Sequence, residues 1–335
     1  MSHPDPWARR RSVWRRLAWQ RAYTAAALTL SLFVIYLVLN GGFGAIEALG
    51  ITNAALPLAL AAAGQTFVIL TNGIDLSIGS IITLANVTCA VVAADGHAAL
   101  AVFAAVGVGA AAGLANGVIV SYLRIAPLIA TLATGSIYFG FALIVLPNPG
   151  GSVPSWLSSW TSGSIGSLPV AAIWLALAIV LGWLVLRRTK FGLNLQALGG
   201  NESAAWSAGI KVNRTRIGAY VASGFCSGLA GLVLAGLTQS GDPTIGAVYL
   251  LDGVAAVVIG GTSLAGGVGT VAGSIYGAIA LSLVQSVLLV SDVSTNYQYI
   301  VTGLIVIGAL LAHSIHGNVG ARLTQRRQLV TEAVD

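Results

Sequence analysis

The sequence predicts an all-α membrane protein, a polytopic helical bundle with about ten transmembrane helices, some of them broken. First, 56% of its 335 residues are hydrophobic, and the mean hydropathy is +0.88. Second, only 8% are charged, whereas soluble domains carry about a quarter. Third, the apolar residues form runs of about 20, the length of helix that crosses roughly 30 Å of hydrocarbon.

Ten apolar runs meet this requirement, and we expect each to form a membrane crossing. Glycine and polar residues interrupt the second and the eighth run, which either cross fully or are re-entrant. Forty-two glycines suit helices whose backbones pack closely in lipid. The runs lie near 22–40, 51–71, 77–95, 98–123, 127–146, 169–186, 215–237, 249–262, 266–290 and 297–313.

The lysine and arginine side chains predict the orientation of the bundle. With a cytoplasmic N-terminus, all 16 fall on the cytoplasmic side: six in residues 1–21, Arg124 alone, six in residues 187–216 and three after the last run. Short cytoplasmic loops carry such an excess. We expect a basic cytoplasmic tail over 1–21, partly on the lipid surface, a transmembrane domain over 22–313 and a cytoplasmic tail over 314–335. The net charge of +6 therefore reflects topology and predicts no nucleic-acid partner.

One predicted outer segment has a character of its own. Residues 147–168 are uncharged and rich in proline, glycine and serine, and they include Trp156 and Trp160. Because indole rings prefer the headgroup layer, we expect a short interfacial helix around these two tryptophans.

Residues 187–216 form the longest polar interruption and are expected to contain a short helix within 199–210. An N-cap residue, an acid in the first turn, helix-favouring alanines and a glycine stop follow one another there. On these residues alone, a plain cytoplasmic connector with helical caps is the simpler interpretation. The residues concerned are Gly200, Asn201, Glu202, Ala205, Trp206 and Gly209.

Two polar breaks separate pairs of apolar runs. In the first, over 65–80, Asn72-Gly73 end one helix, while Asp75 and Ser77 are suited to cap the next. A buried carboxylate in a membrane is costly unless it is solvated, paired or at a helix end. Asp75 is therefore either a structural cap or a group that lines a cavity, and both roles remain open. The second break, over 260–270, has a similar order of glycine, leucine and hydroxyl residues, which indicates an internal repeat.

Four runs resemble the permease subunits of bacterial ABC sugar importers, specifically the ribose-type branch. Residues 191–231, beginning FGLNLQALGGNESAAW, resemble the coupling loop of that family. Residues 65–87, QTFVILTNGIDLSIGSIITLANV, resemble its glycine-isoleucine-aspartate-leucine-serine signature. Residues 257–278, VVIGGTSLAGGVGTVAGSIYGA, and 127–145, PLIATLATGSIYFGFALIV, resemble its second glycine-rich signature and its fifth span.

The resemblance implies a permease subunit of an ABC importer for a monosaccharide in the bacterial cytoplasmic membrane. It implies that the 199–210 helix docks into a groove on a separate ATPase subunit, which binds the ATP, so this chain itself holds no cofactor. Ser203 and Trp206 depart from the family pattern, in which an acidic and a basic residue are common there. The other implied partners are a periplasmic sugar-binding protein and a second permease, identical or different.

A neutral sugar calls for hydroxyl and amide groups along its pathway rather than charge. Small polar side chains also join membrane helices to one another, and this structural role is the simpler interpretation of each. The candidates for the translocation pathway are Gln65, Asn72, Asp75, Asn86, Asn116 and Gln285.

Several motifs of other functional classes are absent from the sequence. It has no G-x-x-x-x-G-K-[ST] phosphate loop and no plausible catalytic set, which predicts a transport subunit without ATPase activity. Cys89 and Cys226 lie inside apolar runs, which indicates buried side chains rather than a disulfide or a metal site. The main alternative is an ion-coupled secondary transporter of a small polar solute in which Asp75 carries the ion. A structural or sensory membrane protein is a further alternative.

Overall fold

The computed structural model describes residues 6–294, 297–298, 300–305, 307–308 and 311, and these are mostly helical. The elements are α1 (Pro6–Asn40), α2 (Ala45–Ile69), α3 (Ile78–Ala94), α4 (Ala98–Tyr122), α5 (Pro127–Val145), α6 (Ser155–Ser162), β1 (Ser164–Ile165), β2 (Leu168–Pro169), α7 (Val170–Arg188), α8 (Lys190–Gly200), α9 (Glu202–Ser207), α10 (Val212–Thr238), α11 (Tyr249–Ile259) and α12 (Val271–Val290).

The described part contains seven helices that are long and apolar enough to cross a membrane. They are α1 from Ala22 onward, α2, α4, α5, α7, α10 and α12. Two further apolar helices are shorter: α3 has 17 residues and α11 has 11. The predicted last crossing, 297–313, lies partly outside the described residues. The prediction of a polytopic helical bundle is confirmed at this level.

The two interrupted runs have different structures. The second run lies in α2, whose 25 residues give a length of about 37 Å, enough to cross the hydrocarbon. The eighth run forms α11, whose 11 residues reach only about 16 Å. α11 is therefore too short to cross by itself, because it ends before Gly260-Gly261, and the choice between a full crossing and a re-entrant segment for the eighth run stays open.

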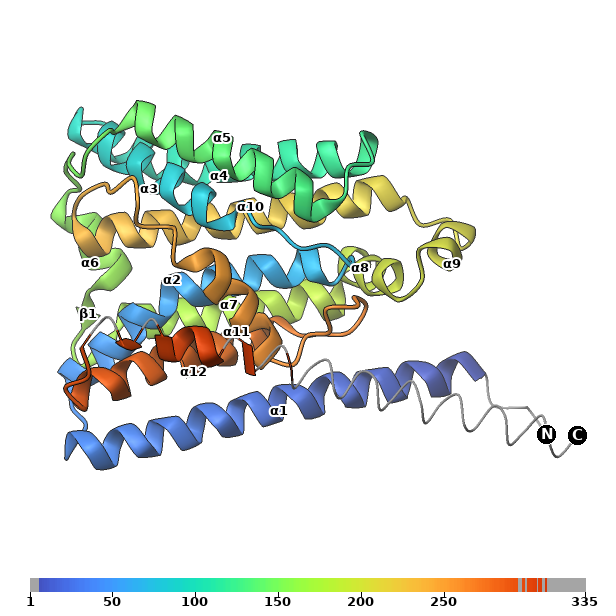
Figure 1. Cartoon of the computed structure of the whole chain (residues 1–335), viewed down its shortest axis with the longest axis horizontal. Helices are drawn as coiled ribbons and strands as arrows, with labels where there is room; N and C mark the ends of the chain where they lie inside the picture. The colour runs from blue at the N-terminus through green and yellow to red at the C-terminus, as the bar shows by residue number, and fades with distance from the viewer. Residues whose placement is uncertain (1–5, 295–296, 299, 306, 309–310, 312–335) are drawn as a thin grey trace, which may run out of the picture.

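The helices lie side by side along the long axis of the molecule, so the chain has two distinct ends (Figure 1). One end carries α8, α9, the start of α1 and the turn between α4 and α5, which contains Arg124. The opposite end carries α6 and β1, which pairs with β2 in a short antiparallel hairpin. The polar connector is thus separated by the length of the bundle from the tryptophan-bearing segment.

The short helix predicted around Trp156 and Trp160 is present as α6, and its interfacial position stays a prediction. Trp156 and Trp160 are both exposed on it, and the Trp160 carbonyl accepts a hydrogen bond of 2.9 Å from Nε1 of Trp174 on α7. Exposed indole rings at one end of a membrane bundle fit the headgroup layer.

Glycine allows α4 and α10 to pack with their backbones in contact. Gly109, Gly113 and Gly117 recur every fourth residue, so they lie on one face of α4. A Cβ atom on Gly109 would overlap the carbonyl oxygen of Gly224, and one on Gly113 would overlap that of Tyr220. This small-residue spacing is typical of tightly packed membrane helices. It places α10 at the centre of the bundle, against α4, α2 and α3.

Candidate functional site

The polar connector contains the short helix that the sequence predicts, α9. Oδ1 of Asn201 accepts a hydrogen bond of 2.9 Å from the backbone N–H of Ala204, so Asn201 is its N-cap. The helix ends at Ser207, and Gly209 follows with a φ of +79°. The amides of Gly209 and Ile210 donate back to carbonyls of the last turn, as in a Schellman motif. Both predicted helix signals are therefore confirmed.

One side of α9 faces the bundle and the other faces outward. Ala205 is buried, whereas the Trp206 side chain is 72% exposed. Gly200 and Gly209, on either side of the helix, are exposed as well. An exposed indole at the tip of a polar projection is costly in water and well suited to a binding partner.

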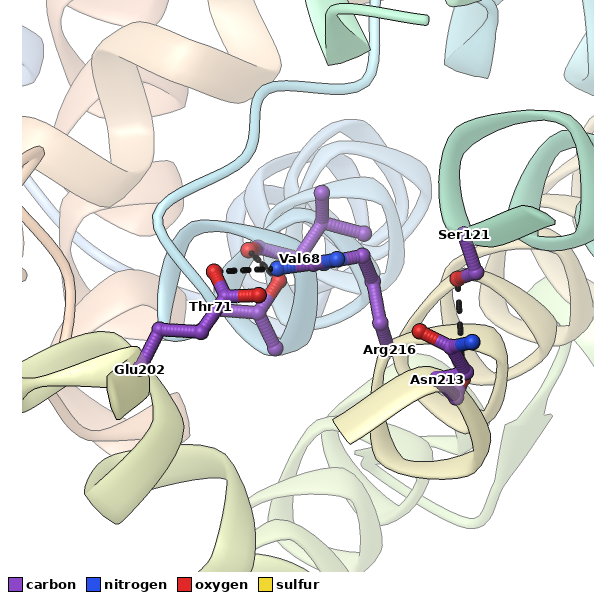
Figure 2. A network of polar contacts seen from close by, with 6 residues as sticks. All are labelled: Val68, Thr71, Ser121, Glu202, Asn213 and Arg216. Carbon is purple, nitrogen blue, oxygen red and sulfur yellow. Dashed lines mark hydrogen bonds and ion pairs between the residues drawn. The ribbon is translucent and has the colours of Figure 1, made fainter. Parts of the chain in front are cut away.

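An ion pair joins α9 to α10. Figure 2 shows the Glu202 side chain extending from α9 toward Arg216 on α10, where Oε2 and Nη2 lie 2.7 Å apart. The Glu202 side chain is 57% exposed and that of Arg216 only 17%. In the same view, Oγ of Ser121 on α4 donates to the backbone carbonyl of Asn213 at 3.5 Å. The ion pair connects α9 to α10, the central helix of the bundle, and the Ser121 bond connects α10 to α4.

A second helix in the connector, α8, was not predicted. The Thr189 hydroxyl caps it by accepting a hydrogen bond of 3.1 Å from the backbone N–H of Gly192. Leu195 and Leu198 are buried, so α8 packs into the bundle rather than projecting from it. Thr189 at a helix start, with leucines three residues apart, is the sequence signal that could have indicated it.

A cavity of about 1530 Å³ lies between α9, the turn from α4 to α5, and the ends of α2 and α10. Exposed residues such as Asn72, Arg124 and Trp206 line it. So does Tyr220, whose hydroxyl is buried and has no hydrogen-bond partner in the described part of the chain. The cavity therefore leads from the α9 end toward the first polar break.

The first break begins with a left-handed residue. Asn72 has a φ of +62°, and the amides of Asn72 and Gly73 donate at 2.9 and 3.2 Å to the carbonyls of Ile69 and Val68. This is a Schellman cap with asparagine in the position that glycine usually takes. The predicted end of the helix at Asn72-Gly73 is confirmed.

Asp75 lies at the centre of a buried hydrogen-bond network. Its Oδ1 accepts from the backbone N–H and the hydroxyl of Ser77 at 3.0 and 2.6 Å, and its Oδ2 accepts from the Ser223 hydroxyl at 3.0 Å. Nδ2 of Asn116 donates to Oγ of Ser77 at 2.7 Å, and the Tyr138 hydroxyl donates to Oδ1 of Asn116 at 3.0 Å. The network joins the break to α4, α5 and α10.

Ser77 departs from its predicted role. It stands at the N-cap position of α3, but its hydroxyl accepts no hydrogen bond from an α3 amide. The hydroxyl donates to Oδ1 of Asp75 at 2.6 Å instead. Asp75 is thus held at the start of α3 by three donors.

The second break has the same kind of helix end as the first. Gly261, with a φ of +80°, and Thr262 donate through their amides to the carbonyls of Val258 and Val257 at 2.9 and 3.1 Å. Beyond the break, the Thr270 hydroxyl caps α12. In both places a helix stops at a Schellman cap, an irregular segment follows and a new helix begins, as the predicted repeat requires.

The pathway candidates occupy different environments. Asp75 and Asn116 both form a hydrogen bond with the Ser77 hydroxyl. Asn86 lies elsewhere, and its Oδ1 accepts a hydrogen bond of 2.8 Å from the backbone N–H of Asp242. Gln65 is fully buried on α2, and neither of its amide atoms has a partner in the described part of the chain. Asn72 lines the cavity, and Gln285 is half-buried on α12. The six residues do not form one cluster.

Three participants were not found from the sequence. Tyr138 and Ser223 complete the Asp75 network, and Arg216 pairs with Glu202. Ser223 is 148 residues from Asp75 along the chain. No local pattern connects Asp75 with Ser223, so only the packing of α10 against the first break identifies Ser223.

Comparison with known proteins agrees with this architecture. Residues 47–310 match the family described as branched-chain amino acid transport system, permease component. The ribose import permease of Bacillus subtilis is 38% identical over 84% of this chain and 88% of its own length. The galactofuranose transporter permease of Escherichia coli is 35% identical over 79% of this chain and 78% of its own length. The galactose/methyl galactoside import permease of Haemophilus influenzae is 34% identical over 79% of this chain and 84% of its own length.

No solved structure matches the chain significantly. The family match nevertheless includes both breaks, the polar connector and most of the predicted transmembrane domain. The chain therefore belongs to the branched-chain amino acid transport system permease family, a family of inner-membrane transport proteins.

Proposed function

We propose that this chain is the permease subunit of an ABC importer and that its substrate is a monosaccharide. The observation that carries the proposal is its similarity, over most of its length, to permeases named for ribose, galactofuranose and galactose. The family description itself names branched-chain amino acids, so an apolar amino acid is the specific alternative substrate.

The proposed topology is a bundle of about ten spans with both termini in the cytoplasm. A basic tail over 1–21 and a tail over 314–335 would flank the transmembrane domain over 22–313. The cations of the connector and Arg124 lie at the same end of the bundle as the start of α1, which supports this orientation. The end that carries α6 would then face the periplasm.

We propose that the energy for transport comes from a separate ATPase subunit, which binds the ATP. α9 would dock into a groove of that subunit through Trp206 and its neighbours, while Glu202 keeps the helix in register with α10. A periplasmic binding protein would deliver the sugar at the opposite end, and a second permease, identical or different, would complete the pathway. Closure of the ATPase pair would then shift the bundle between its two arrangements.

Gln65 is the pathway candidate that the geometry supports best. Three of the other candidates form hydrogen bonds within the protein, as residues that join helices do: Asn86, Asn116 and Asp75. Gln65 is buried with its amide free, which is costly unless a polar solute or water pairs with it in another state.

Uptake in membrane vesicles tests the proposal. The chain, co-expressed with its ATPase and binding protein, should accumulate radiolabelled ribose or galactose but not leucine. ATP depletion should stop uptake, and collapse of the ion gradients should leave it intact. Uptake that survives ATP depletion and fails with the gradients would instead indicate an ion-coupled secondary transporter.

A further inference from the structure

Three segments far apart in the sequence meet beside the base of α9. They are the end of α8 at Gly199-Gly200, the end of α2 at Leu70, and the second break at Gly266-Gly267. The amide of Gly267 donates a hydrogen bond of 3.1 Å to the carbonyl of Leu70, so the two breaks are joined directly. We call these residues the glycine junction.

The glycine junction is packed backbone against backbone. A Cβ atom on Gly199 would overlap the Leu70 carbonyl oxygen and lie 2.5 Å from the amide nitrogen of Gly267. A Cβ atom on Gly267 would lie 2.9 Å from the amide nitrogen of Gly200. A Cβ atom on Gly266 would lie 3.0 Å from the carbonyl oxygen of Gly199. The atoms nearest to these three positions are backbone atoms, so we expect a displacement of one segment to displace the others.

The segments that the junction joins have distinct structural roles. A single residue, Asn201, separates Gly200 from α9, so α9 and the junction are contiguous. Leu70 begins the irregular segment that leads to Asp75, five residues on. Gly267 lies in the loop between the cap of α11 and the start of α12. The junction is therefore the place where the connector touches both breaks at once.

The ion pair between Glu202 and Arg216 also connects α9 to the bundle. It is exposed on the Glu202 side, and exposed ion pairs are screened by water and salt. Two flexible side chains also transmit displacement less directly than backbone contact does. The ion pair can orient α9, whereas the junction has the stiffness to move the breaks.

We propose that the glycine junction transmits movement of α9 to both polar breaks, with Gly199 as the positioning residue that makes this possible. The inference rests on the proposed function, because it assigns the source of the movement to an ATPase docked on α9. It adds that the two breaks respond together, as one unit with the end of α8.

Two glycines provide a matched test of this role. Gly199→Ala places a methyl group in the junction, whereas Gly107→Ala, at an exposed position of α4 outside the junction and the connector, meets nothing within 4 Å. Both variants would carry Ala265→Cys as reporter, an exposed residue of the second break, with Cys89 and Cys226 replaced by alanine. The readout is the rate of maleimide labelling in the assembled complex, with and without Mg-ATP and vanadate.

The nucleotide should change the labelling rate about fivefold or more in the Gly107→Ala variant and leave it nearly unchanged in Gly199→Ala. An equal change in both variants would overturn the role of the junction while leaving the ATPase coupling in place. If no ATPase co-purifies, or if nucleotide has no effect even in Gly107→Ala, the proposed function itself falls.

A second measurement decides the case in which Gly199→Ala does not fold. Spin labels on Ala197→Cys and Ala265→Cys, two exposed positions on α8 and in the second break, leave the junction residues themselves intact. Their separation should stay constant when nucleotide is added, while the separation between labels on Ala197→Cys and Arg124→Cys should change. A nucleotide-dependent change between the first pair would show that the segments move independently and would overturn the proposal.

Discussion

At the scale of single residues, the molecule distinguishes polar groups that hold it together from polar groups left free. Asp75 accepts three hydrogen bonds from Ser77 and Ser223 in a fully buried position. Gln65, equally buried, has none in the described part of the chain. A buried group that is satisfied stabilises one conformation, whereas an unsatisfied one favours a change of state or a ligand.

For Asp75, removal of the acceptor should cost more than neutralisation. Asp75→Ala leaves three buried donors without their acceptor and should lower the free energy of unfolding by about 3 kcal/mol. Asp75→Asn keeps an acceptor oxygen toward Ser77 and should retain most of the stability and ATP-dependent uptake. Thermal unfolding in detergent and vesicle uptake measure the two effects.

Asp95→Asn is the matched control for Asp75→Asn, because Asp95 is an exposed residue at the end of α3. It should leave both stability and uptake unchanged. Complete loss of uptake in a stable Asp75→Asn variant would contradict the structural role and favour an ion-carrying carboxylate.

For Gln65, replacement by leucine should separate stability from transport. Gln65→Leu replaces an unpaired buried amide by an apolar side chain of similar volume. It should raise the free energy of unfolding by about 1 kcal/mol. It should also reduce sugar uptake, because the free amide is lost from the proposed pathway. Asn86→Leu should do the opposite to stability, since it removes the acceptor of the Asp242 amide. Unchanged uptake in Gln65→Leu would exclude Gln65 from the pathway.

At the scale of elements, the two helices of the connector, α8 and α9, have different environments. α8 buries its leucines in the bundle, while α9 projects Trp206 outward. The segment between α7 and α10 thus forms one helix that packs into the bundle and one helix that is exposed. Because α8 fixes the position of the segment, the Trp206 side chain on α9 can be held in place while it stays exposed.

Removing the exposed contacts of α9 should impair coupling without unfolding the protein. The double variant Glu202→Ala/Trp206→Ala should keep its thermal stability to within about 1 kcal/mol, because both side chains are largely exposed. ATP hydrolysis in the complex should no longer be linked to sugar uptake. Leu193→Ala, which removes an exposed apolar side chain from α8, is the control and should keep the two linked. Normal coupling in the double variant would mean that α9 is only a connector.

At the scale of the whole molecule, the two ends of the bundle carry different chemistry. The α9 end holds the cations of the connector and a large cavity, whereas the α6 end holds exposed tryptophans. The asymmetry matches the charge bias that orients membrane proteins.

Labelling single cysteines from each side of the membrane tests this orientation. Trp206→Cys on α9 should react with a membrane-impermeant maleimide only in inside-out vesicles. Trp160→Cys on α6 should react only in intact spheroplasts. Both residues are well exposed, so failure to label from either side would not arise from burial. Reaction of Trp206→Cys from the periplasmic side would overturn the topology and the docking of an ATPase on α9.

The sequence by itself determined the class of the protein and the features that depend on neighbouring residues. Long apolar runs must become helices in lipid, because no water is present to satisfy their backbone. Caps such as Asn201 and Gly209 are equally local, since they depend on conformational preferences over a few residues. The helix of the connector, its stop and the end of α2 at Asn72-Gly73 could therefore be predicted.

Only the tertiary structure decided which faces meet. In a membrane helix nearly every face is apolar, so periodicity does not tell the face that packs against protein from the face that meets lipid. The contacts of Asp75 with Ser223 and of Gly199 with Leu70 and Gly267 follow from close packing between segments distant in sequence. The ion pair of Glu202 with Arg216 likewise depends on how α9 lies against α10.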